Sequence, residues 1–184
     1  MVVIVVMGVC GSGKTTVAKE LADRMQCSFR DGDEFHAQAN KDKMSCGIPL
    51  SDEDRIPWLS AIHEHIKRLV QTDQSGIVTC SALKQRYRDI LLSGNSSPEI
   101  ALGLKNLNAK DVLFVYLHGT KAVIQERLQK RSGHFMPPSL LDSQLESLEE
   151  PSYPEKYLTV NIENTVDKAV DYILQCLKSI SVIE

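Results

Sequence analysis

Apolar runs and amphipathic segments alternate along the whole chain. Continuous apolar runs rich in β-branched residues are typical of strands covered on both faces, as in a parallel sheet. Strands are predicted at Val2–Met7, Ser28–Arg30, Ile77–Cys80, Val112–Leu117 and Tyr157–Ile162. Apolar residues repeated every three or four positions are typical of helices. Helices are predicted at Lys14–Met25, Asp52–Val70, Leu83–Leu92, Lys121–Lys130, Ser139–Leu148 and Val166–Leu177.

The alternation of strands and helices predicts an α/β fold with a mostly parallel sheet and right-handed crossovers. Gly, Pro, Asn and Ser between Ser93 and Lys110 predict an irregular excursion there. With 184 residues, of which 42% are hydrophobic and 24% charged, the composition predicts one globular domain over residues 1–184 and excludes a disordered chain.

The charge and the cysteines narrow the class of protein further. A net charge of -3 gives no general attraction to nucleic acid or to an anionic membrane, so any affinity for phosphate must come from a local site. The apolar N-terminal run is too short to cross a membrane and is interrupted by Gly8. The five cysteines form no CxxC pair and no zinc-site spacing, which favours reduced, cytosolic thiols.

The segment Gly8–Thr15, GVCGSGKT, matches the P-loop pattern GxxxxGK[ST] between a predicted strand and a predicted helix. Backbone N–H groups of such a loop and the following helix N-terminus bind phosphate, the lysine (Lys14) reaches the β- and γ-phosphates, and the hydroxyl of Thr15 binds Mg²⁺. Cys10 has either a backbone role only or a thiol whose pKa the loop N–H groups lower. The residues expected to bind the nucleotide are Gly8, Val9, Cys10, Gly11, Ser12, Gly13, Lys14, Thr15 and Thr16.

The rest of the sequence restricts the kind of P-loop protein. A GTPase would carry an Asn-Lys-x-Asp guanine motif, and the nearest string, at 40–43, ends in Lys and precedes the third strand. The third strand ends in Cys80-Ser81, without the carboxylate of a motor ATPase. These differences favour a kinase of a small substrate.

Candidate acceptor-binding residues follow the second predicted strand. Asp31 and Asp33 can orient a substrate hydroxyl, accept its proton and help to hold hydrated Mg²⁺; an ordinary turn is the alternative. His36 and Lys43 continue at helical spacing, either as a hydroxyl-binding wall or as solvated surface. Trp58 belongs either to the core or to the wall of the site.

Three further groups of basic residues are candidates for binding negatively charged groups of the substrates. Arg55 can bind a carboxylate bidentately. Lys84 and Arg88 share a helix face that has no acidic partner at helical spacing, which favours an anion as their partner. Arg127 and Arg131 end a helix, where they either complement the helix dipole or belong to a mobile lid that neutralises the transferring phosphate.

Taken together, the strings GVCGSGKT, DGDEFH, DRIPWL, CSALKQRYRD and GHFM, in this order, resemble the gluconokinase family, the ATP-dependent kinases that make 6-phosphogluconate. The resemblance extends from Val2 to about Pro151. Because this family is similar to shikimate and nucleoside-monophosphate kinases, it implies a five-stranded parallel sheet of order 2-3-1-4-5, helices on both faces, and a lid around 131–150. It also implies ATP, Mg²⁺ and D-gluconate as ligands and a cytoplasmic, often dimeric enzyme.

The resemblance also implies roles for individual positions. The expected catalytic residues are Lys14, Asp31, Asp33, Arg127 and Arg131. The expected substrate-binding residues are Asp33, His36, Lys43, Arg55, Lys84, Arg88 and His134. The expected metal-binding residues are Thr15 and Asp31. The chain departs from the family pattern at Cys10 and Thr15, where Ser is usual or frequent, and at Ala37, where Pro is frequent.

The expected reaction is transfer of the γ-phosphate of ATP to the 6-hydroxyl group of D-gluconate. Two other classes remain open. One is a kinase of another small acid, such as a shikimate-kinase-like enzyme, or of a nucleoside, although an aromatic content of 5% gives little support to base stacking. The other is a nucleotide-binding regulator without enzymatic activity.

Overall fold

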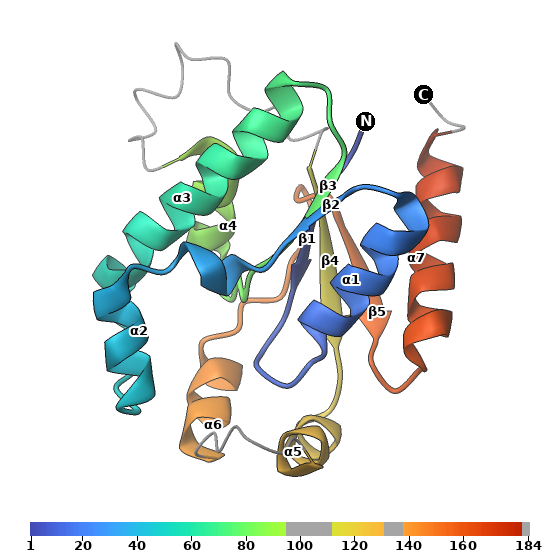
Figure 1. Ribbon diagram of the computed structural model, residues 1–184. Coiled ribbons are helices and arrows are strands. Elements are labelled where there is room, and N and C mark those ends of the chain that lie inside the picture. The colour runs from blue at the N-terminus through green and yellow to red at the C-terminus, as the bar shows by residue number, and fades with distance from the viewer. Residues whose placement is uncertain (95–111, 131–137, 182–184) are drawn as a thin grey trace.

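A computed structural model describes residues 1–94, 112–130 and 138–181 (Figure 1). Its strands are β1 (Val3–Met7), β2 (Ser28–Arg30), β3 (Gly76–Thr79), β4 (Val112–His118) and β5 (Tyr157–Asn161). Its α-helices are α1 (Lys14–Met25), α2 (Gln38–Ser45), α3 (Asp52–Gln71), α4 (Gln85–Ser93), α5 (Lys121–Lys130), α6 (Pro138–Glu146) and α7 (Val166–Ser181), and a 3₁₀ turn, η1, covers Gly32–Phe35.

The five strands form one sheet of order β2-β3-β1-β4-β5 in which every pair is parallel. β1 is the central strand, and its Val5 pairs with Val78 of β3 on one side and Phe114 of β4 on the other. The predicted strand order 2-3-1-4-5 is therefore confirmed.

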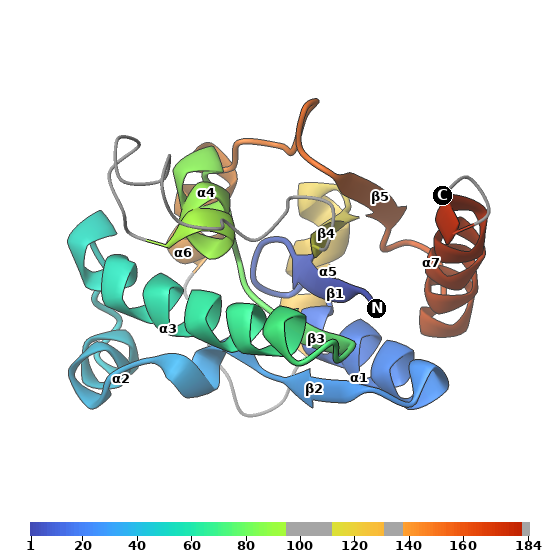
Figure 2. The same ribbon diagram turned by 90° about the horizontal axis from the view of Figure 1, so that it is seen from above.

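Helices cover both faces of the sheet, and each face has its own core (Figures 1 and 2). Side chains of a strand alternate between faces. In β1, Ile4 and Val6 pack with Ile173 of α7 in one core, whereas Val5 packs with Ile62 of α3 in the other. All five residues of β1 are buried, which explains why this strand is an uninterrupted apolar run.

Most predicted elements are found within a few residues of their predicted bounds. The helices at Lys14–Met25 and Lys121–Lys130 have the bounds that were predicted. Helix α2 was not predicted, because its sequence QANKDKMS has no apolar stripe. The predicted excursion lies almost entirely in 95–111, outside the described residues.

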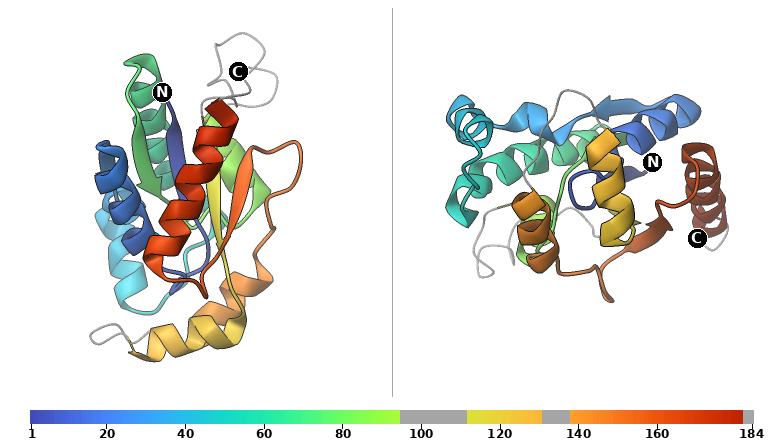
Figure 3. Two further views of the ribbon diagram at one scale, coloured as in Figure 1. Left: turned by 90° about the vertical axis from the view of Figure 1, so that its right-hand side faces the viewer. Right: turned by 90° about the horizontal axis from the view of Figure 1, so that it is seen from below.

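The carboxyl ends of the strands meet at one edge of the sheet, near α5 and α6 (Figure 3). The P-loop follows β1, Asp31 follows β2 and Cys80 follows β3 at this edge. In open α/β sheets this edge is where ligands bind. No helix within the described ranges combines the length and the hydrophobicity of a membrane span.

Candidate active site

The loop between β1 and α1 has the backbone shape of a phosphate cradle. Gly13 is the N-cap of α1 with a φ of 94°, in the left-handed region that favours glycine. Gly11 has a φ of 76°, and a Cβ there would lie 2.7 Å from Cγ of Leu128 in α5. Both positions therefore require glycine. Cys10, Gly11, Gly13, Lys14, Thr15 and Thr16 line the cavity, while Gly8, Val9 and Ser12 are buried behind its wall.

The ammonium group of Lys14 points into the loop rather than toward solvent. Its Nζ donates to the carbonyl oxygens of Gly8 and Val9, at 3.0 and 2.9 Å. Burial lowers the pKa of Lys14, and the nearby Cys10 and Asp33 oppose that shift. The ammonium group is therefore held where a P-loop receives phosphate.

Asp31 connects the P-loop helix to the end of β2. Its Oδ2 accepts from the Thr15 hydroxyl at 2.9 Å, and its Oδ1 accepts from the Thr79 hydroxyl at 3.0 Å and from the N–H of Asp33 at 3.1 Å. Hydroxyl and carboxylate oxygens are the ligands that Mg²⁺ prefers. The oxygens of Thr15 and Asp31 are adjacent and face the cavity, so this pair fits the predicted metal-binding role.

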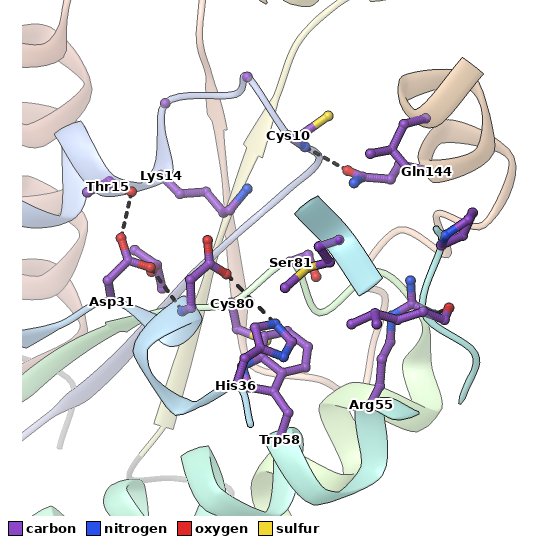
Figure 4. A pocket seen from close by; sticks show the side chains of 18 of the residues that line it. Cys10, Lys14, Thr15, Asp31, His36, Arg55, Trp58, Cys80, Ser81 and Gln144 are labelled. Atoms are coloured by element: carbon purple, nitrogen blue, oxygen red, sulfur yellow. Dashed lines mark hydrogen bonds and ion pairs between the residues drawn. The ribbon is translucent and has the colours of Figure 1, made fainter. Parts of the chain in front are cut away.

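The cavity at this edge has a volume of about 750 Å³, large enough for two small ligands. Figure 4 shows Lys14, Thr15 and Asp31 together, with Arg55 lying apart from them beside α3. Between these groups the wall contains Asp33, His36 and Trp58. Apolar residues complete the wall: Met44, Ile48, Pro49, Leu50 and Leu140.

Asp33 and His36 both line the cavity but differ in how far their side chains are exposed to solvent. The Asp33 side chain is 88% exposed and that of His36 only 4%, and Nε2 of His36 lies 4.0 Å from Oδ1 of Asp33. The ring of His36 stacks on Trp58 with centroids 4.2 Å apart, and Trp58 donates from Nε1 to the carbonyl of Gly32 at 2.6 Å. Burial lowers the pKa of His36, which favours the neutral ring. Trp58 belongs to both the core and the cavity wall.

Arg55 is the predicted carboxylate-binding residue that lines the cavity. Its Nη1 donates to the carbonyl of Leu50 at 2.5 Å and lies 3.9 Å from Oδ1 of Asp52. The guanidinium group is also 5.8 Å from the ring centroid of Tyr87. These contacts orient the group and leave donors for an anion.

Lys43 and Lys84 are paired with acids and do not line the cavity. Lys43 Nζ lies 2.8 Å from Oδ1 of Asp54, and Lys84 Nζ lies 2.8 Å from Oδ2 of Asp52. The hydrogen bond from Lys84, followed by that from the Tyr87 hydroxyl, lowers the pKa of Asp52. The prediction that an anion is the partner of Lys84 is wrong, because Asp52 of α3, outside the helix spacing considered, already binds its ammonium group.

The contacts of Arg88 indicate a structural role. Its side chain is 1% exposed, and its Nε and Nη2 donate to the carboxylate of Glu155 at 2.5 and 3.0 Å. Its Nη1 donates to the carbonyls of Ala82 and Glu149 at 3.1 and 2.8 Å. The prediction that Arg88 offers a free cation to an anion is therefore wrong: the guanidinium group binds the segment after α6 to the β3–α4 connection.

The predicted lid is described in part. Arg127 lines the cavity, and its guanidinium group donates to the carbonyls of Ser12, at 3.4 Å, and of Ile162. Arg131 and His134 lie outside the described residues. Gln144 of α6 was not predicted, yet its Oε1 accepts from the N–H of Cys10 at 2.7 Å. The two residues are 134 positions apart, so no local spacing could have indicated the contact.

The thiols near the site are not activated. Burial raises the pKa of Cys10, against the lowering effect of Lys14, and burial raises the pKa of Cys80 to about 12. The interpretation of Cys10 as a residue with a backbone role is thus favoured over that of a reactive thiol.

Comparisons with known proteins agree on one group. A family model described as shikimate kinase matches residues 10–178. The chain is 44% identical to a Xenopus tropicalis protein named "Probable gluconokinase", over 93% of this chain and 90% of the relative. It is 39% identical to the thermosensitive gluconokinase of Escherichia coli K12, over 96% of this chain and 87% of the relative. The crystal structure of a gluconokinase from Sinorhizobium meliloti 1021 has a TM-score of 0.80 and 39% identity, covering 97% of this chain and 93% of that chain.

Proposed function

The chain belongs to the gluconokinase family, in the shikimate kinase group of P-loop kinases, and we propose that its cavity transfers the γ-phosphate of ATP to the 6-hydroxyl group of D-gluconate. One observation carries the proposal: a single cavity is lined by the P-loop and by a carboxylate (Asp33), a histidine (His36) and an arginine (Arg55). The P-loop half suits the phosphates of a donor. The other half suits an acceptor that has hydroxyl groups and a carboxylate.

On the donor side, we assign the triphosphate to the N–H groups of Gly11 and of the loop from Gly13 to Thr16. Lys14 contributes a positive charge at the β- and γ-phosphates, and Arg127 contributes a second one from α5. Thr15 and Asp31 are the residues that would hold Mg²⁺. When bound, Mg²⁺ neutralises charge on the phosphates.

On the acceptor side, we assign the 6-hydroxyl group to Asp33. Its exposed carboxylate projects from the strand edge that also carries the phosphate site. In a loose transition state, orientation of the hydroxyl matters more than removal of its proton. The ring of His36 lines the same cavity with Nε2 4.0 Å from Oδ1 of Asp33, so this nitrogen can bond a further hydroxyl of the open-chain acid.

We assign the carboxylate of gluconate to Arg55. In an open-chain six-carbon acid, the carboxylate lies at the opposite end from the 6-hydroxyl group, and Arg55 lies apart from the phosphate-binding residues (Figure 4). Lys43, Lys84 and Arg88 do not line the cavity and hold carboxylates at 2.5–2.8 Å. Arg55 lines it, and its carboxylate neighbour Asp52 lies farther away, at 3.9 Å. A planar guanidinium group suits bidentate binding of a carboxylate.

The remaining expectations of the family resemblance belong to this proposal. Residues 131–150 serve as the lid of a single 1–184 domain, and α6 is its described part. Free cysteines at all five positions support a cytoplasmic enzyme. The dimeric state that the family resemblance implies stays a prediction, testable by light scattering.

ADP release from Mg·ATP tests the proposed function. The acceptors to compare are D-gluconate, other sugar acids, polyols, shikimate and nucleosides. We expect gluconate to give the highest kcat/KM, with a product whose phosphorus is bonded to the oxygen of a CH₂ group, as ³¹P coupling to two protons reveals. Preference for shikimate, or ATP binding without turnover on any acceptor, would replace the proposal by one of the two alternative classes.

A further inference from the structure

The peptide group between Val9 and Cys10 is held from both sides. Its carbonyl oxygen, on Val9, accepts from Lys14 Nζ at 2.9 Å. Its N–H, on Cys10, donates to Oε1 of Gln144 at 2.7 Å. One peptide plane therefore connects the P-loop ammonium group to a residue of α6, and Figure 4 shows Cys10 and Gln144 meeting at the cavity wall.

Helix α6, the described part of the predicted lid, is anchored to the core along one face. Leu141 is fully buried in the core on the α1 side of the sheet, and Leu145 packs against that core. Leu140 and Gln144, one turn apart, both line the cavity. From α5, Leu128 closes off the space beside Gly11. The tip of the P-loop is thus bounded by α5 and by α6, the described part of the predicted lid.

The two hydrogen bonds reinforce each other. An ammonium group on a carbonyl oxygen polarises the peptide and strengthens the N–H at its other end as a donor. The acceptor for this N–H is Oε1 of the uncharged Gln144 side chain. An apolar residue there would leave the Cys10 N–H without this partner, and the peptide could rotate away from Lys14.

We propose that Gln144 is a positioning residue for phosphoryl transfer: through the Val9–Cys10 peptide it fixes the site at which Lys14 meets the phosphates. The proposal rests on the proposed function and adds a residue from α6 to the donor side. Since Gln144 acts on the placement of a charge that is used in the transition state, its loss affects kcat more than KM for gluconate.

Replacement of Gln144 by methionine removes the acceptor and keeps the length of the side chain. We expect Gln144→Met to lower kcat 10- to 100-fold, which corresponds to about 1.4–2.7 kcal/mol, with KM for gluconate changed less than threefold. Gln144→Asn, which retains the amide but is one methylene shorter, should also lose activity and serves if the methionine variant does not fold. The exposed Glu146 on the same helix provides the control: Glu146→Gln should match the unmutated protein.

A double-mutant cycle with Lys14 separates positioning from a structural role. If Gln144 acts through Lys14, adding Gln144→Met to Lys14→Ala should lower the single-turnover rate less than twofold further. An equal loss in both backgrounds, or a normal kcat in folded Gln144→Met and Gln144→Asn, would overturn the proposal. Absence of gluconate turnover in the unmutated protein would instead overturn the proposed function, so the two failures are distinct.

Discussion

Replacing Arg88 by methionine should destabilise the protein and leave substrate recognition unchanged. Arg88 and Glu155 have side chains that are 1% and 9% exposed, and the same guanidinium group also bonds the carbonyls of Ala82 and Glu149. Methionine fills a similar volume and leaves the buried carboxylate of Glu155 unpaired. Removing one partner of a buried ion pair costs about 3–5 kcal/mol.

That cost is a large share of a typical unfolding free energy of about 5–15 kcal/mol. For a domain of this size each kcal/mol shifts Tm by about 2–4 °C, so Arg88→Met should lower Tm by about 6–20 °C. Adding Glu155→Leu removes the unpaired carboxylate and should recover part of the loss, because replacing both partners of a buried pair by apolar groups costs less than breaking it.

The assay combines thermal unfolding with steady-state kinetics well below the lowered Tm. We expect KM for gluconate within threefold of the unmutated value, with the loss confined to stability. An unchanged Tm together with a KM raised more than tenfold would refute this reasoning and return Arg88 to the substrate site.

Of three further predictions, two concern the site and one concerns the pH dependence of stability. Lys14→Ala should lower kcat by about 10²–10³-fold with Tm retained, since the lost charge acts mainly in the transition state. Near-normal turnover in this variant would contradict the assignment of Gly8–Thr15 as a catalytic P-loop. Asp33→Asn should lower kcat by about 10²-fold or more and barely change Tm, because the side chain is 88% exposed; a large fall in Tm with modest loss of turnover would mark a structural residue. Burial lowers the pKa values of His36 and His65 from 6.5. The unfolded chain therefore binds more protons just below pH 6.5, and the free energy of unfolding should fall with pH from 6.5 down to the lowered values. Urea unfolding at pH 7.0 and 5.5 measures this, and an equally steep fall in His65→Gln would exclude His65 as a contributor.

The sequence predicted the sheet and the phosphate site well because both depend on local patterns. The apolar run of β1, the glycines of the loop and the amphipathic α1 are contiguous, and each follows from its own residues. Asp31 and Asp33 were identified because the ends of parallel strands share one edge.

The predictions that failed depend on contacts between distant segments. Arg88 and Lys84 have no acidic neighbour at helical spacing, yet Glu155 and Asp52 reach them from elsewhere in the chain. Helix α2 lacks a local signal, and Asn40, its one buried residue, donates to the carbonyl of Asp54 at 2.8 Å. A pattern within one element contains no information about such partners.

The ratio of kcat/KM for D-gluconate to that for sorbitol tests the central claim most directly. The two differ at one end, where sorbitol has a hydroxymethyl group in place of the carboxylate. An acceptor that leaves a pocket cation unpaired is penalised by about 2–5 kcal/mol, so we expect gluconate to be preferred by about 10²–10³-fold or more. Arg55→Met should narrow the ratio mainly by harming gluconate. Comparable values for the two acceptors in the unmutated protein would contradict a site built to recognise the acid.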